Sequence, residues 1–187
     1  MPEKKGVKVP KEADVLKLIE KCKKANTKAW IDNTKTEPFF AQEVKGGKIT
    51  STNKNEKFDY TEYTLSNGAK VIIKKTDFKN DEILVSAQSA GGTSMYEDKD
   101  MINAQFAANI IDQCGIGTYD HSQLMKFMKG KNFGLSPEIG ELQEGLSGSC
   151  SPKDFETQLQ YMYMFFTAPR ADKEVLDNTI DKLKTQI

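Results

Sequence analysis

The residues that could support catalysis are few and lie far apart along this 187-residue chain. His121 is the only histidine, so the chain alone cannot build a zinc site with two imidazoles. It stands at an expected helix start, where a capping or surface role is usual. Cys22, Cys114 and Cys150 lack the CxxC spacing of a zinc knuckle or a redox dithiol, and we expect buried or half-buried thiols. A nucleophilic pair of Cys114 or Cys150 with His121 stays open, although no sequence feature brings them together.

Three other patterns have structural explanations that we favour over ligand sites. Glu97, Asp98 and Asp100 could form a calcium site or an acid pair, but an acidic first helical turn is commoner. Gly115-Ile116-Gly117 lacks the third glycine and the strand-to-helix setting of a phosphate cradle, so it predicts a helix stop. The aromatic and methionine run 161–166 could resemble a ligand box. Its spacing covers more than one helix face, which favours packing against both a sheet and a neighbouring unit.

Charge and hydropathy exclude several classes of partner. The 27 basic and 27 acidic side chains cancel, so no long-range field would gather nucleic acid or an anionic membrane. No uncharged apolar run approaches the roughly 20 residues that span a bilayer, and the first residues do not form a secretory signal. We therefore expect neither nucleic acid nor membrane as a partner.

The first 56 residues differ in character from the rest of the chain. Residues Lys11–Lys24 predict a short amphipathic helix, whose apolar stripe is Val15, Leu16, Ile19 and Cys22. The Thr-, Asn-, Lys- and Gly-rich segment that follows suits a long linker, with partial disorder as the alternative. We expect it to be pinned by its isolated aromatic residues, Trp30, Phe39 and Phe40.

Residues 57–187 predict one α+β domain. The run YTEYTLSNGAKVIIKKTDF indicates two strands around Asn67-Gly68, a pair whose tolerance of positive φ suits a type I′ hairpin turn. Helices laid on one face of a mainly antiparallel sheet are the expected architecture. Further strands are expected at Glu82–Gln88, which Ala90-Gly91-Gly92 ends, at Phe133–Ile139 and at Glu141–Ser149.

Four helices complete the expected domain. The first, Asp100–Gln113, should end at Gly115 and Gly117 and bury Ile102, Phe106, Ile110 and Ile111. A second should span His121–Lys129. The third follows the cap Ser151-Pro152-Lys153-Asp154 and should turn Phe155, Leu159, Met162 and Phe166 inward before Pro169. The last runs from about Asp172 to Ile187, and since no return strand follows it, we expect a domain cut inside a larger protein.

The order of these signals resembles the pitrilysin/insulinase family of zinc metallopeptidases, which includes the mitochondrial processing peptidases. The similarity covers about residues 60–187. Each motif is weak alone, but their order and spacing together are specific. They are an opening hairpin L-x-N-G-x-x-V at Leu65, Asn67, Gly68 and Val71, the small turn Gly91-Gly92, L-x-K-x-x-x-G-K at Leu124, Lys126, Gly130 and Lys131, and F-T-x-P-R at Phe166–Arg170.

The resemblance implies a two-half enzyme that closes around a peptide. In the family, the helix after the third strand carries H-x-x-E-H, whose histidines and a downstream glutamate hold zinc, while the first glutamate is the general base. The equivalent helix here contains MINAQFAANII, from Met101 to Ile111, with neither imidazole nor carboxylate. No catalytic or metal residue is therefore transferred, the substrate-binding residues stay unassigned, and Arg170 receives no role.

We therefore expect a non-catalytic domain, the first of the second half, that forms part of the peptide chamber and follows the inter-half linker at residues 1–56. Its implied partners are the catalytic half, which would hold the zinc, and the peptide substrate, with self-association of the isolated fragment as a further expectation. The compartment stays open between the bacterial cell envelope and the cytoplasm. The alternatives are a stand-alone interaction or scaffold module of the same fold and, third, an autonomous enzyme using Cys114 or His121.

Overall fold

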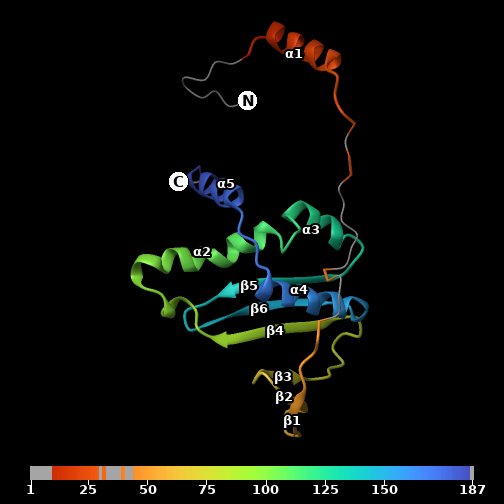
Figure 1. The fold of residues 1–187 in the computed structure, drawn as a ribbon, viewed down its shortest axis with the longest axis vertical. Helices are drawn as coiled ribbons and strands as arrows, with labels where there is room; N and C mark the ends of the chain where they lie inside the picture. Colours follow the sequence, from red (N-terminus) through yellow and green to blue (C-terminus); the bar gives the residue numbers. More distant parts are fainter. Residues whose placement is uncertain (1–9, 30, 33–38, 41–43, 186–187) are drawn as a thin grey trace. The chain divides into compact units, whose positions relative to one another are not determined.

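The computed structural model describes residues 10–29, 31–32, 39–40 and 44–185 (Figure 1). The chain divides into two compact units, residues 1–33 and residues 34–187. Trp30, one of the expected anchors, lies outside the described residues. Among the described helices, none has the length and apolar character needed to cross a bilayer.

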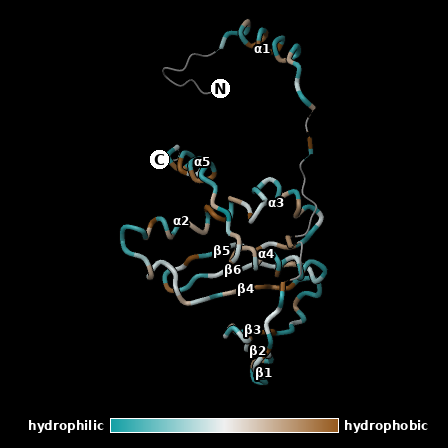
Figure 2. Tube along the Cα trace, viewed as in Figure 1, coloured by the Kyte–Doolittle hydropathy of each residue, from teal (hydrophilic) through white to brown (hydrophobic). Residues whose placement is uncertain are grey.

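The first unit contains helix α1, Glu12–Lys24, which confirms the predicted helix to within one residue. Its first turn is acidic and its last turn carries lysines, the arrangement that the helix dipole favours. Hydrophilic and hydrophobic residues alternate along it (Figure 2), yet none of its residues is buried. The prediction that Cys22 is at least half-buried is wrong, because this thiol is exposed.

The second unit begins with a three-stranded antiparallel sheet of order β1-β2-β3, formed by β1 (Ile49–Asn55), β2 (Tyr60–Leu65) and β3 (Lys70–Ile73). Strand β1 lies within the stretch expected to be a linker. Its residues, ITSTNKN, show no apolar alternation, so no strand was indicated there. Asn55 closes the β1–β2 turn by accepting a hydrogen bond from the Phe58 amide at 3.1 Å.

The hairpin at Asn67-Gly68 forms, but the type I′ turn predicted for it is wrong. Gly68 has a φ of 86°, whereas Asn67 is not among the described residues with positive φ. The Gly68 amide donates to Leu65 O at 2.9 Å, and the Leu65 amide donates to Ala69 O at 2.8 Å. These bonds close a three-residue loop with one left-handed glycine, as in hairpins that end in a G1 bulge.

A second antiparallel sheet has the order β4-β6-β5. Its strands are β4 (Ile83–Ala90), β5 (Phe133–Ile139) and β6 (Gln143–Cys150), which confirm the predicted strands to within two residues. One face buries Phe133, Leu135 and Leu146. The other face presents an exposed row of small side chains, in which Ser86 and Ser136 both pair in register with Ser147.

Helices α2 (Asp98–Cys114), α3 (His121–Met128), α4 (Phe155–Thr167) and α5 (Lys173–Lys184) complete the unit, with short 3-10 turns at Thr93–Met95 and Pro152–Asp154. Asp120 caps α3, since its Oδ1 accepts the Gln123 amide at 2.8 Å. Gly115, with a φ of 85°, ends α2 as predicted. The α+β class is confirmed, although the strands form two small sheets rather than one.

The buried face of α4 differs from the predicted one. The buried residues are Gln158, Tyr161, Met164 and Phe165, whereas Phe155, Leu159 and Phe166 are exposed and Met162 is half-buried. The sequence carries two apolar stripes on this helix, at positions 155, 159, 162 and 166 and at positions 161, 164 and 165. The prediction chose the wrong stripe because a glutamine at position 158 completes the true one.

The prediction for α2 is also partly wrong. Ile102 is 68% exposed and Phe106 is 46% exposed, while Ile110 and Ile111 are half-buried. The fully buried positions are Ala104 and Cys114, because α2 lies across β5 with its small residues against the sheet.

An aromatic cluster forms the centre of the core. Phe39, from the expected linker, lies with its ring centroid 4.6 Å from Phe127 and 5.7 Å from Tyr161. Tyr119 and Phe133 also contact its ring, at 5.6 and 6.5 Å. Phe39 therefore anchors its segment in the domain, as predicted.

Candidate functional site

The turn between β4 and α2 has a backbone conformation that requires glycine. Gly92 has a φ of 78°, and a Cβ there would come within 2.4 Å of the Gly140 carbonyl oxygen. The Gly92 amide faces Glu144 Oε2 at 3.4 Å, and the Thr93 amide donates to Gly140 O at 2.8 Å. The Gly91-Gly92 motif therefore fastens the end of β4 to the β5–β6 connection and sets where α2 starts.

Helix α2 starts with acidic residues and carries no metal ligands in its central turns. Glu97 is its N-cap residue and pairs with Lys99 at 2.7 Å, while Asp98 and Asp100 occupy the first turn. Within the residues that the structure describes, no group of three or more His, Cys, Asp or Glu side chains could hold a metal ion. The acidic cluster thus has the geometry of a helix start.

The candidate nucleophiles lie in surroundings that suit a structural role. Cys114 is buried, and its Sγ accepts a hydrogen bond from the Asp172 amide at 3.3 Å. Cys150 is also buried, and burial, with a smaller effect of Asp154, raises the pKa of its thiol, which disfavours the nucleophilic thiolate. His121 begins α3 directly after the capping residue Asp120. Within the part of the chain that the structure describes, no hydrogen bond joins His121 to either buried thiol.

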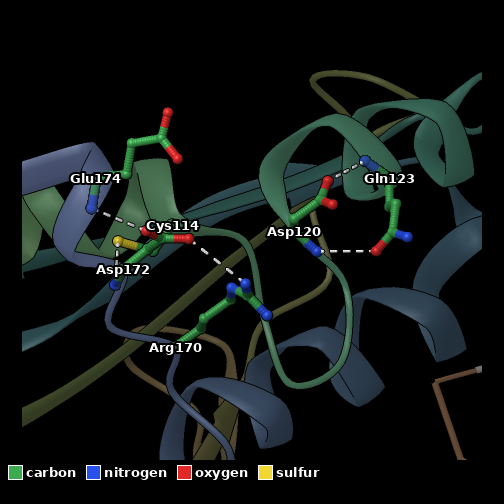
Figure 3. Close-up of polar contacts among 6 residues, drawn as sticks. All are labelled: Cys114, Asp120, Gln123, Arg170, Asp172 and Glu174. Atoms are coloured by element: carbon green, nitrogen blue, oxygen red, sulfur yellow. Dashed lines mark hydrogen bonds and ion pairs between the residues drawn. The ribbon is translucent and has the colours of Figure 1, made fainter. Parts of the chain in front are cut away.

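A polar cluster joins the start of α5 to the end of α2 (Figure 3). Arg170 Nη2 lies 3.4 Å from Asp172 Oδ2, and Asp172 Oδ1 accepts the Glu174 amide at 3.0 Å. Asp172 therefore caps α5 and, through its own amide on Cys114, fixes that cap to α2. Arg170, the last residue of the F-T-x-P-R motif, supports this junction.

The surroundings of Asp112 on α2 favour the neutral carboxyl group over the charged carboxylate. Burial raises its pKa, and the nearby His121 lowers it by a smaller amount. The same carboxylate adds to the burial that raises the pKa of the Tyr161 hydroxyl. Asp112 is thus an electrostatic neighbour of both His121 on α3 and Tyr161 on α4.

An apolar pocket of about 270 Å³ lies over the end of the β4–β6–β5 sheet. Helix α2 contributes Ala108 and Ile111 to it, and α4 contributes Phe165 and Phe166. Glu144 of β6, whose Oε2 faces the Gly92 amide, also lines the pocket. Sequence patterns did not indicate this pocket, because its walls come from five separate segments and only their packing brings them together.

Comparison with known proteins gives both sequence and structural relatives, although no family model matches the chain. The chain is 28% identical over 138 residues to a zinc protease PQQL-like protein of Arabidopsis thaliana. It is 23% identical over 130 residues to a probable zinc protease PqqL of Haemophilus influenzae. These matches cover 74% and 70% of this chain but only 12% and 14% of the relatives. The chain therefore spans a small part of the length of the proteins that it matches.

Two solved structures share the fold. The crystal structure of a mutant of the ferredoxin protease FusC, in complex with Arabidopsis ferredoxin, matches 96% of this chain with a TM-score of 0.71 and 21% identity. The periplasmic protease PqqL from Escherichia coli matches 94% with a TM-score of 0.72 and 20% identity. In both cases the match covers 20% of the solved chain. The sequence matches to zinc proteases and this shared fold together support the resemblance to the pitrilysin-like family of zinc peptidases.

Proposed function

We propose that this chain is a non-catalytic domain of a pitrilysin-like zinc peptidase, and that it forms one wall of the chamber in which the parent enzyme holds a peptide. The observation that carries the proposal is the composition of α2. This helix follows β4 through the Gly91-Gly92 turn, where the family resemblance places the zinc-binding helix, but Met101–Ile111 contains no histidine, glutamate or aspartate.

The donor set of α2 does not fit zinc. Zinc in a peptidase needs three protein ligands from imidazole or carboxylate groups, and its bound water needs a general base. In MINAQFAANII the polar groups are the amides of Asn103, Gln105 and Asn109, which are poor zinc ligands and cannot act as a base. The proposal therefore assigns hydrolysis, and the zinc, to a different half of the parent enzyme.

A wall without catalytic groups can still raise the rate of hydrolysis. Contacts that hold a peptide at points remote from the scissile bond contribute binding energy that positions the reacting groups. A sheet edge suits this role because an extended peptide can add to it as a further strand.

Strand β4 is the better of the two edges. In the order β4-β6-β5, β4 and β5 are both edge strands, but Pro137 interrupts β5 and has no amide hydrogen to donate. Strand β4 has eight residues without proline, about 26 Å of extended chain. We assign peptide binding to the outer edge of Ile83–Ala90.

The remaining parts of the proposal concern the neighbours of this domain. We assign residues 57–187 to the wall domain. We assign residues 1–56 to α1 and the linker between the halves. In this assignment, β1 and Phe39 hold the end of the linker against the wall domain. The partners are then the catalytic half and a peptide substrate. The protein substrate in the FusC complex belongs to that relative, and we propose only an unfolded peptide segment for this chain.

The first test is peptide binding to β4. An unstructured peptide from β-casein is added to the 187-residue chain, and hydrogen exchange of the β4 amides is followed by mass spectrometry. The expected result is slower exchange within Ile83–Ala90. The matched control is the same peptide with alternate backbone amides N-methylated, which removes strand donors and should give no protection. Equal exchange with and without the unmodified peptide would remove the β4 assignment.

The second test separates the wall domain from a scaffold module. The chain is mixed with a separately expressed catalytic half and the companion domain of its own half, and cleavage of a quenched fluorescent peptide is measured with and without a zinc chelator. The proposal expects chelator-sensitive cleavage that depends on this chain, and no cleavage by the chain alone with added zinc. Association without any change in cleavage would favour the scaffold module. Cleavage by the chain alone would contradict both readings.

A further inference from the structure

Phe39 fills a socket whose walls are four aromatic rings. Its ring stacks on that of Tyr161, with a centroid separation of 5.7 Å and an angle of 17° between the ring planes. Tyr119 and Phe133 meet it nearly edge-on, at 76° and 86°, and Phe127 lies closest, at 4.6 Å. We define these four wall residues as the aromatic socket. Stacked and edge contacts match the charge distribution of an aromatic ring, so the socket suits a ring better than an aliphatic group.

The walls of the socket also contact one another. Tyr119 and Phe127 form a T-shaped pair with a centroid separation of 5.6 Å. Phe133 and Tyr161 form a second T-shaped pair, also at 5.6 Å. Neither pair includes Phe39. Each wall ring therefore keeps an aromatic partner when the ring of Phe39 is absent.

The backbone that carries the walls is fixed by hydrogen bonds that do not involve Phe39. Two backbone bonds, at 2.9 and 2.8 Å, close the turn between α2 and α3, which carries Tyr119. The Gly117 amide in that turn donates to Ala168 O at the end of α4, at 2.9 Å. Gln158 joins α4 to β5 at 2.9 Å. The socket is therefore part of the domain frame, whereas Phe39 comes from a segment outside the helices and strands.

The neighbouring Phe40 adds a second and weaker contact. Its ring is half-buried and meets Tyr163 of α4 at 5.3 Å, and Tyr163 is itself 42% exposed. The contacts described for Phe39 and Phe40 are thus contacts between aromatic rings, and residues 44–47, which follow, are exposed. This tie opens by loss of ring contacts, without disruption of a helix or a strand.

We propose that the aromatic socket is a binding site for one aromatic side chain of a peptide segment, and that Phe39 is its tethered ligand. Because the walls hold without the ring, a phenylalanine from a free peptide can take the place of Phe39. The tether gives Phe39 an advantage equal to a free concentration on the order of millimolar. Replacement of the ring releases Phe39 and Phe40 from the domain, so this contact acts as a strap that can open. The proposal does not depend on the peptidase function.

The test is binding of a free peptide to the complete chain that carries both Phe39→Ala and Phe40→Ala. The peptide is TKTEPFFAQEVK, residues 34–45, and the ring resonances of the socket are followed by NMR during titration. The expected result is a saturable shift of these resonances. Binding to the parent chain should be at least about tenfold weaker, because its tethered ring already occupies the site.

Two control peptides of equal composition test the requirement for a ring at one position. The peptide with Phe39→Leu should bind the doubly substituted chain at least about tenfold more weakly than the unmodified peptide, whereas the peptide with Phe40→Leu should bind almost as well. Equal binding of the two leucine peptides, or equal binding to the parent and substituted chains, would overturn the site. Absence of binding to the folded variant would do the same. A substituted chain that circular dichroism shows to be unfolded would also overturn the proposal, because the proposal requires walls that hold without Phe39.

Discussion

Gln158 on α4 donates a hydrogen bond through Nε2 to the carbonyl oxygen of Gly134 on β5 at 2.9 Å, and its side chain is fully buried. Its Oε1 has no partner among the described residues. This bond joins a helix to an edge strand 24 residues away in sequence and helps to set which side of α4 faces the sheet.

Replacement of Gln158 by alanine should lower the free energy of unfolding by about 2 to 4 kcal/mol, because it leaves a cavity and an unpaired buried carbonyl. Gln160→Ala is the matched control. That residue pairs with Glu156 on the exposed side of α4, so its loss should cost less than about 0.5 kcal/mol. Urea denaturation measures both values, and similar costs at the two positions would show that the buried bond has no special role.

Asp154 should make stability depend on pH. Its Oδ2 accepts the Ser151 hydroxyl at 2.6 Å and the Asn132 amide at 2.8 Å. These two hydrogen bonds lower the pKa of the carboxyl below its ordinary value of 3.8. Because the folded pKa is the lower one, the stabilisation is present above pH 4 and is lost as the pH falls through the folded value.

The measurement is the urea midpoint of the parent chain and of Asp154→Asn between about pH 2 and pH 7. The parent should be more stable near neutral pH, and the difference between the two proteins should shrink as the pH falls below 4. A difference that stays constant across this range would mean that hydrogen bonding to the charged form contributes nothing.

Phe39 should be essential for the stability of the domain although it lies outside the predicted helices and strands. Its ring contacts four aromatic residues of the core, so Phe39→Ala should cost about 3 to 5 kcal/mol. Phe40→Ala is the neighbouring control, since Phe40 is half-buried and meets Tyr163 at 5.3 Å; about 1 kcal/mol is expected. Thermal unfolding followed by circular dichroism distinguishes these values. Equal costs would argue against Phe39 as the anchor.

Two glycines provide a matched pair for backbone strain. Gly115 and Gly130 have φ values of 85° and 79°, so an alanine at either position costs about 1 kcal/mol from conformation alone. A Cβ on Gly115 would come within 2.3 Å of the Tyr119 carbonyl oxygen, whereas nothing lies within 4 Å of one on Gly130. Gly115→Ala should therefore cost at least about 2 kcal/mol more than Gly130→Ala in urea denaturation. A difference near zero would show that the α2–α3 turn can shift to make room.

Local signals in the sequence predicted most elements of the second unit. Glycines indicated the ends of β4 and α2, the Asn67-Gly68 pair indicated a hairpin, and Asp172 indicated the start of α5. These signals are local, because each residue acts through its own backbone or through the adjacent turn. The turn type was wrong because Asn67 and Gly68 can form more than one loop, and strand pairing selects among them.

Sequence could not show which side of a helix is buried when two stripes compete. On α4, Gln158 is buried through a hydrogen bond to a strand, and Phe166 is exposed although it is strongly apolar. On α2, Ala104 is buried and Ile102 is exposed, since closeness to the sheet favours a small side chain. The pocket at Phe166 and Glu144 was not predictable either, because it depends on the packing of segments far apart in sequence.

The sparse burial of α2 has a consequence for how this helix can change over evolutionary time. Only Ala104 and Cys114 of its 17 residues are fully buried, and no zinc ligand restricts its central turns. Most single substitutions in Met101–Asn109 that keep helix propensity should therefore be close to neutral for folding. A helix with so few buried side chains is free to accumulate sequence differences, while the glycine turn before it and the Cys114 junction after it stay under selection.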